Sequence, residues 1–135
     1  MKLTPTERRK GQLGTRRRGA ALETLQSDGY VVLENALPKN LVATLRKDFN
    51  AFVRRHVAAN PQMLDPDRPG HGIFGLHPPR EMPYMDTRII ANSFTLPILE
   101  QALGEHFFCA FYNTNTSWPG SGIQSVHRDS SPLVA

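Results

Sequence analysis

Apolar and polar positions follow a helical period in some stretches of the chain and a strand-like pattern in others. The longest helical pattern lies between residues 36 and 60, where apolar side chains recur every three or four positions and most basic ones fall outside that stripe. Pro38 suits the first turn of this helix. The stripe consists of Leu41, Leu45, Phe49, Phe52 and Val53, with His56 at its border.

Two shorter stretches also have helical spacing. Residues 19–30 predict an amphipathic helix with Gly29 as its stop, because glycine commonly ends helices. Residues 88–106 predict one or two short helices, with Gly104 in the same terminal role. Leucines spaced to face a core support the second prediction, namely Leu96, Leu99 and Leu103.

Three stretches are rich in β-branched and aromatic residues and predict strands. They are Tyr30–Leu33, residues 107–118 and residues 123–129. Cys109 lies in the second of them and is expected to be a small buried apolar residue. The fold class predicted by these elements is α+β.

Between these elements lies a long segment without a sustained period. Residues 60–86 contain six prolines and three glycines and predict an irregular loop. Long loops in compact domains often bind ligands. The loop contains two histidines, His71 and His77. We expect both to be solvated side chains rather than residues with a chemical role.

Length and composition describe an ordinary globular protein. The chain has 135 residues, of which 39% are hydrophobic and 21% charged, and this suits one domain. No apolar run approaches the roughly 18 residues of a membrane span, and no secretory leader is recognisable. Cys109 is the only cysteine, which excludes an internal disulfide framework and a cysteine-based zinc cluster. We therefore expect a cytoplasmic protein with no membrane partner.

The positive charge is concentrated at the N-terminus. The whole chain carries a formal net charge of +4, yet residues 1–18 alone hold seven Lys or Arg and one Glu. We expect residues 1–18 to form a disordered basic arm and residues 19–135 to form the domain. An alternative is a nucleic-acid-binding module whose arm contacts phosphates. The more common role of such an arm, a solubilising leader, weighs against that alternative.

The letters HRD near the C-terminus permit two interpretations. Protein kinases continue this motif with Leu, three residues and Asn, but here Ser130 and Val134 occupy those two positions. The kinase interpretation is therefore set aside. In a strand, residues two apart point to the same side, so His127 and Asp129 are placed to hold one metal ion. A histidine and a carboxylate are two of the three ligands of the facial triad that holds Fe(II).

The order of features resembles the phytanoyl-CoA dioxygenase family of Fe(II)/2-oxoglutarate-dependent oxygenases. The resemblance covers roughly residues 20–132 and includes a Gln three residues before the His. Its parts are DGYVVLENALP (28–38) with the long helix behind it, ILEQALG (98–104), FYNTNTSW (111–118) and PGSGIQSVHRD (119–129). The resemblance implies a double-stranded β-helix, or jelly-roll, of which this chain has the N-terminal helices and the first strands.

The resemblance also implies the chemistry. His127 and Asp129 match the first two iron ligands, and Asn113, Asn115 and Gln124 occupy the region where such enzymes surround the cosubstrate 2-oxoglutarate. Which of those three side chains faces the site is left open, because a one-residue shift of register swaps faces. The implied reaction is hydroxylation of a small-molecule substrate.

The position of the motif adds one more expectation. The family's third ligand is a His well downstream, followed by an Arg that binds 2-oxoglutarate, and the chain ends six residues after Asp129. We expect an N-terminal fragment with an incomplete, truncated active site that is inactive alone and needs a complementing C-terminal fragment. A non-catalytic remnant is the alternative.

Overall fold

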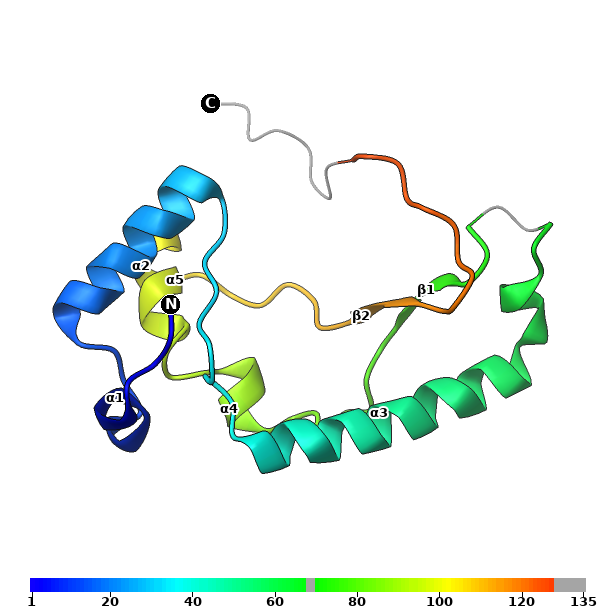
Figure 1. The fold of residues 1–135 in the computed structure, drawn as a ribbon, viewed down its shortest axis with the longest axis horizontal. Helices are drawn as coiled ribbons and strands as arrows, with labels where there is room; N and C mark the ends of the chain where they lie inside the picture. The colour runs from blue at the N-terminus through cyan, green and yellow to red at the C-terminus, as the bar shows by residue number, and fades with distance from the viewer. Residues whose placement is uncertain (68–69, 128–135) are drawn as a thin grey trace. The chain divides into compact units, whose positions relative to one another are not determined.

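The fold consists of two compact units, which we describe separately. A computed structural model of the protein describes residues 1–67 and 70–127 (Figure 1). Unit 1 contains residues 1–50 and 78–112, and unit 2 contains the described residues of 51–77 and of the chain from Asn113 onward. The described part of the chain holds five α-helices and one two-stranded antiparallel sheet, so the predicted α+β class is confirmed.

Unit 1 is helical. It contains four helices, α1 (Pro5–Lys10), α2 (Thr15–Asp28), α4 (Thr87–Ile90) and α5 (Leu96–Leu103), and it includes the start of α3 (Lys39–Ala59). Helices α2 and α5 pack against each other. The buried apolar residues of unit 1 include Leu3, Ala21, Leu41, Phe94 and Ile98.

The N-terminal residues differ from the expected disordered arm, because they form α1 and the beginning of α2. Thr4 caps α1 in a reciprocal arrangement: its hydroxyl accepts the Glu7 amide at 3.2 Å, and the Glu7 carboxylate accepts the Thr4 amide at 2.9 Å. Leu3 is only 2% exposed. Arg17 binds the Glu7 carboxylate at 2.8 Å. Capping and burial of one leucine thus order a segment that its charge alone suggested to be disordered.

The segment after α2 does not form the expected strand. Gly29 ends α2 in a left-handed conformation, as predicted. The following Tyr30–Leu33 are not a strand, and Tyr30 is 66% exposed. The residue that follows this segment, Glu34, forms an isolated parallel β-bridge with Lys2. A strand needs a neighbour for its backbone groups, and one bridge does not supply a continuous ladder.

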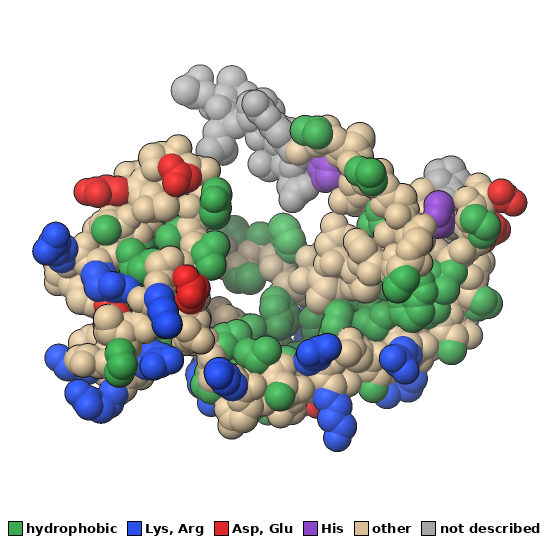
Figure 2. Space-filling view, in the orientation of Figure 1, with side chains coloured by type: hydrophobic (Ala, Val, Ile, Leu, Met, Phe, Trp, Pro, Cys, Tyr) green, Lys and Arg blue, Asp and Glu red, His purple; other side chains and the backbone are tan. Residues whose placement is uncertain are grey.

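The long helix is confirmed. Helix α3 has 21 residues within the predicted 36–60 range. Leu41 and Val53 of the predicted stripe are buried, and so is Val57, one turn beyond Val53. Figure 2 shows Lys and Arg side chains along its outer edge. The stripe therefore identified the inner face of α3 correctly.

Unit 2 contains a short antiparallel pair of strands that come from distant parts of the sequence. Strand β1 (Ile73–Leu76) pairs antiparallel with β2 (Thr114–Ser117), and Leu76 lies opposite Thr114. Phe74 and Leu76 are buried. The sequence predicted an irregular loop here, whereas the structure contains β1 and the 3₁₀ helix η1 (Pro61–Leu64). A four-residue strand flanked by glycines and prolines is too short to produce a recognisable period.

The two predicted C-terminal strands are largely wrong. Of residues 107–118 only β2 is a strand, and residues 123–127 form none. Cys109 is exposed, not buried, and its thiol donates to the Phe111 carbonyl at 3.2 Å. Phe108 is 83% exposed. Within the described residues, no neighbouring strand offers this apolar segment a partner.

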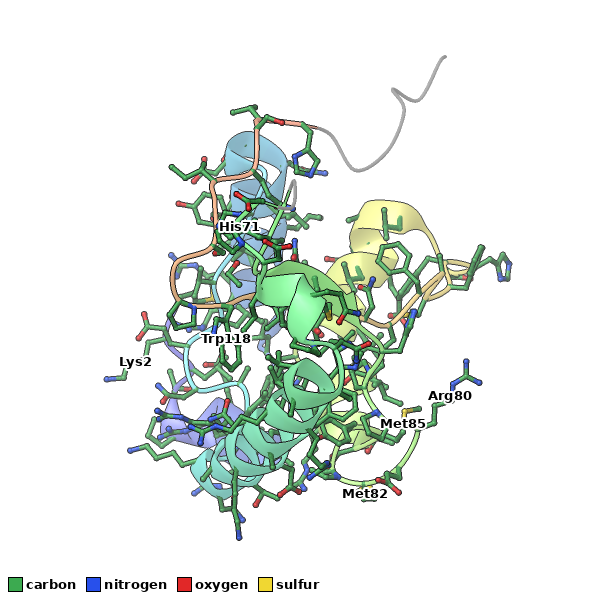
Figure 3. The ribbon with its side chains drawn as sticks, turned by 90° about the vertical axis from the view of Figure 1, so that its right-hand side faces the viewer. Lys2, His71, Arg80, Met82, Met85 and Trp118 are labelled. Atoms are coloured by element: carbon green, nitrogen blue, oxygen red, sulfur yellow. The ribbon has the colours of Figure 1, made fainter. Side chains whose placement is uncertain are left out.

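Unit 1 also presents an exposed turn before α4. Met82 is 66% exposed and Met85 is 37% exposed. Figure 3 shows both side chains, with Arg80, at the periphery of the ribbon. The neighbouring Tyr84 is buried, and its carbonyl accepts the Tyr112 hydroxyl at 3.1 Å. This bond fixes the end of the 107–112 segment to unit 1.

Candidate functional site

The predicted site residues lie in unit 2, on and after β2. Thr114 and Thr116 face one side of β2, where Thr114 donates to the Leu76 carbonyl at 3.2 Å. Asn115 is on the other face, exposed and opposite Gly75. Asn113 immediately precedes the strand and is also exposed. The two asparagines are thus on the solvent side of β2.

A tight turn leads from β2 to the remaining site residues. The Trp118 amide donates to the Gly72 carbonyl at 2.7 Å, and the Ser121 amide donates to the Trp118 carbonyl at 3.0 Å. Gly72 has a φ of +68°, and a Cβ placed there would lie 2.9 Å from the Ser121 Cβ. This close approach requires glycine. The turn therefore packs directly against the residues that precede β1.

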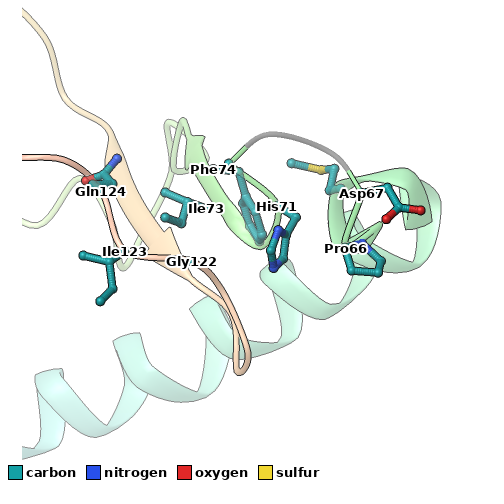
Figure 4. A pocket seen from close by; sticks show the side chains of 10 residues that line it. Pro66, Asp67, His71, Ile73, Phe74, Gly122, Ile123 and Gln124 are labelled. Atoms are coloured by element: carbon teal, nitrogen blue, oxygen red, sulfur yellow. The ribbon is translucent and has the colours of Figure 1, made fainter.

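The turn and the loop before β1 line an open pocket of about 690 Å³ (Figure 4). Its apolar lining comes from Met63, Ile73, Phe74 and Ile123 together with Pro66, and its polar lining comes from Asp67, His71 and Gln124. The His71 ring contacts the Gly120 carbonyl at 3.2 Å through Nε2. The volume and mixed lining suit a small organic molecule.

Of the three predicted cosubstrate residues, Gln124 lines this pocket and the two asparagines do not. The sequence did not single out Asp67. The signal that marked this region was the long proline-rich loop, which supplies one wall of the pocket. His71 was weighed for a chemical role and set aside, yet it reaches from that loop to the turn after β2.

His127 is the last residue that the structure describes, and its side chain is exposed. Its Nδ1 lies 2.7 Å from the Ser125 carbonyl oxygen. A carbonyl only accepts hydrogen bonds, so Nδ1 carries the proton in this contact and the lone pair of the neutral ring is on Nε2. Metal-binding histidines are commonly oriented in this way.

Asp129 lies outside the described residues, so the predicted pairing with His127 stays a prediction. Within residues 1–67 and 70–127, no three His, Cys, Asp or Glu side chains gather as a metal site would require. The donor chemistry of an imidazole Nε2 and a carboxylate nevertheless fits Fe(II). The same described residues include no helix with the length and hydrophobicity to cross a membrane.

The strongest electrostatic shifts belong to unit 1. Hydrogen bonds from the Arg88 side chain and then from its amide lower the pKa of the Asp86 carboxyl to about 2. The amide of Thr4 is the main cause that lowers the pKa of Glu7, with smaller help from the Thr4 hydroxyl and the Arg17 charge. Both carboxylates stabilise local structure.

A scan of protein-family models finds no match to this chain, and searches of curated proteins and of solved structures find no similar protein. The family resemblance therefore stays a prediction from the residues themselves.

Proposed function

We propose that the chain is the N-terminal part of an Fe(II)/2-oxoglutarate-dependent dioxygenase similar to the phytanoyl-CoA dioxygenase family. In this proposal His127 and Asp129 supply two iron ligands. A third ligand and the Arg that binds 2-oxoglutarate come from a complementing C-terminal segment. The jelly-roll is part of the proposal, with β1 and β2 among its first strands.

The observation that best supports the metal role is the orientation of His127. Its Nδ1 contact with the Ser125 carbonyl at 2.7 Å assigns the lone pair to Nε2. When the ring is neutral, this contact leaves Nε2 as the nitrogen that can bind a metal. The H-x-D spacing adds a carboxylate two residues away.

The pocket supports a role in binding a small organic substrate. Gln124 lies on its wall and is three residues before His127 in the sequence. In the proposal, the amide of Gln124 orients a polar group, while Phe74 and Ile123 contact the apolar part of the substrate. Bound iron and 2-oxoglutarate would supply the oxidising chemistry that hydroxylates a C–H bond.

The metal role is tested by anaerobic titration of the chain with Fe(II), followed by NMR. Paramagnetic Fe(II) broadens the signals of nearby nuclei, so we expect selective broadening around residues 125–129. His127→Ala should abolish it, whereas His106→Ala, a change at another exposed histidine, should leave it intact. Broadening that survives in His127→Ala, or no broadening, would overturn the assignment.

The need for a second segment is tested by turnover. Two protein ligands hold Fe(II) weakly, so residues 1–135 alone should release no succinate from 2-oxoglutarate under air. Succinate release by the chain alone, lost in His127→Ala, would show that the chain carries a complete site. It would contradict the need for a C-terminal segment while leaving the metal role in place.

A further inference from the structure

Unit 1 contains a second pocket, of about 340 Å³, that the proposed function does not use. It is formed by α1, the segment before α3, and α4 with the turn that follows it. Its polar lining includes Arg8, Asn35, Thr87, Arg88 and Ser93. No acidic side chain is among its lining residues. Arg88 is paired with Asp86, which is not among the lining residues, whereas Arg8 makes no ion pair with a described residue. The pocket thus keeps one uncompensated positive charge, which favours a negatively charged ligand.

The backbone around this pocket is held in place by the N-terminal segment. The Leu3 amide donates to the Glu34 carbonyl at 3.2 Å, and the Glu34 amide donates to the Met1 carbonyl at 2.9 Å. The next residue, Asn35, has a φ of +62°, in the left-handed region that few non-glycine residues adopt. Such conformations persist where surrounding contacts hold them, often at binding sites.

Arg88 is fixed in orientation by a buried carboxylate. Asp86 is 6% exposed and accepts from Nε of Arg88 at 2.9 Å, from its Nη2, and from its backbone amide at 2.9 Å. The third guanidinium nitrogen, Nη1, has no partner among the described residues. Arg88 therefore lines the pocket in a fixed position, and it retains hydrogen-bond donors on Nη1.

Arg8 supplies a charge that unit 1 does not neutralise. The adjacent Glu7 is engaged by Thr4 and by Arg17, whose Nε lies 2.8 Å from its carboxylate. Arg8 itself makes no ion pair with any described residue. Figure 2 shows the Lys and Arg side chains that gather over α1 and α2. A ligand bound next to Arg8 thus meets a net positive field.

We propose that this pocket binds the phosphate group of a small molecule. A guanidinium group can donate two parallel hydrogen bonds to phosphate oxygens, and Arg8, which makes no ion pair with a described residue, is available for them. Arg88 adds the donors on Nη1, and its fixed position reduces the entropy lost when a bond forms. The volume accommodates a phosphate with a small organic group attached. The site is independent of the iron chemistry proposed for unit 2, so either proposal can fail alone.

The test is a titration of the full chain with inorganic phosphate at constant ionic strength, followed by amide chemical shifts in NMR. We expect saturable shifts in α1, in α4 and near Asn35, with millimolar affinity. Arg8→Gln should weaken binding at least fivefold. The matched control is Arg9→Gln, which removes the same charge from the same exposed helical turn but not from the pocket, and it should change affinity less than twofold.

Four outcomes would overturn the proposal. Shifts that grow linearly without saturation would show only nonspecific charge attraction. If Arg8→Gln and Arg9→Gln weaken phosphate binding equally, the ligand is attracted by a diffuse basic surface. The same conclusion follows if a single-stranded oligonucleotide binds more tightly than phosphate and both variants weaken its binding equally. Equal affinity for acetate would replace the phosphate assignment with a general carboxylate site.

Discussion

Units 1 and 2 are stabilised in different ways. Unit 1 has a capped helix, helix packing between α2 and α5, and a core that contains Leu3 and Ile98, each 2% exposed. Unit 2 has two strands of four residues each, a turn that contacts Gly72, and the end of α3 with buried Val53 and Val57. Two-stranded sheets are marginally stable alone. Unit 1 should therefore resist unfolding better than unit 2.

The candidate iron ligand His127 and the residues of the 690 Å³ pocket belong to unit 2, the less regular unit. Binding residues are often carried by loops that a scaffold positions, and such loops open more easily than cores. Gln124 and His127 lie in irregular chain after the turn, not in a strand. The comparison teaches that the residues proposed to bind iron and its substrate lie apart from the core of unit 1, so each of these two sets can be altered without the other.

The largest expected effect is the loss of a core side chain in unit 1. Ile98→Ala removes a side chain that is 2% exposed, and the cavity should lower the free energy of unfolding of this unit by about 2–4 kcal/mol. Amide hydrogen exchange of α2 and α5 measures it. The control Leu103→Ala, on the same helix and 65% exposed, should cost under about 0.5 kcal/mol. Similar losses in both variants would contradict a core at Ile98.

A smaller effect is expected when the contact at the turn of unit 2 is disrupted. Gly72→Ala combines a φ of +68° with a Cβ only 2.9 Å from Ser121, and should destabilise β1 and β2 by about 1–3 kcal/mol. Gly120→Ala is the control, because the φ of Gly120 is also positive, at +85°, but a Cβ added there would have no atom within 4 Å. Exchange rates of the β1 and β2 amides distinguish the two. An equal effect would mean that backbone strain alone, not the close contact, restricts Gly72.

Helical features were predicted well because their signals are local. The stripe of α3 and the stop at Gly29 depend on neighbouring residues only, and the structure confirms both. The capping pair Thr4 and Glu7 is equally local, yet the surrounding charge directed the interpretation toward disorder. In this case a short-range hydrogen-bond pattern outweighed the net charge of the segment.

Strands were predicted poorly because they depend on distant partners. Phe108 and Phe111 have the composition of a strand, but composition does not provide a neighbouring strand. Strand β1 was missed for the opposite reason, since it forms by pairing with β2 from the far side of the sequence. For the site, the sequence selected Gln124 and His127. It did not select Asp67, whose place on the pocket wall results from loop packing.

The smallest expected effect is a pH dependence in unit 1. The folded pKa of Asp86 is about 2 and its ordinary value is 3.8, because Arg88 binds the ionised form. A lowered pKa adds stability above about pH 4, and that stability is lost as the pH falls toward 2. Solvent weakens this ion pair, since the Arg88 side chain is 53% exposed.

The measurement compares wild type with Asp86→Asn by urea unfolding between pH 5 and pH 2. Asparagine resembles the protonated acid in having no charge, so the stability difference between the two proteins should be constant above pH 4 and shrink toward pH 2. Other carboxylates titrate in the same range, but their contribution cancels in the difference. If the difference in the free energy of unfolding stays constant down to pH 2, Arg88 does not stabilise the ionised carboxylate of Asp86. Arg88 would then have to be held in the pocket of unit 1 by packing alone, and Asp86→Asn would leave phosphate binding unchanged.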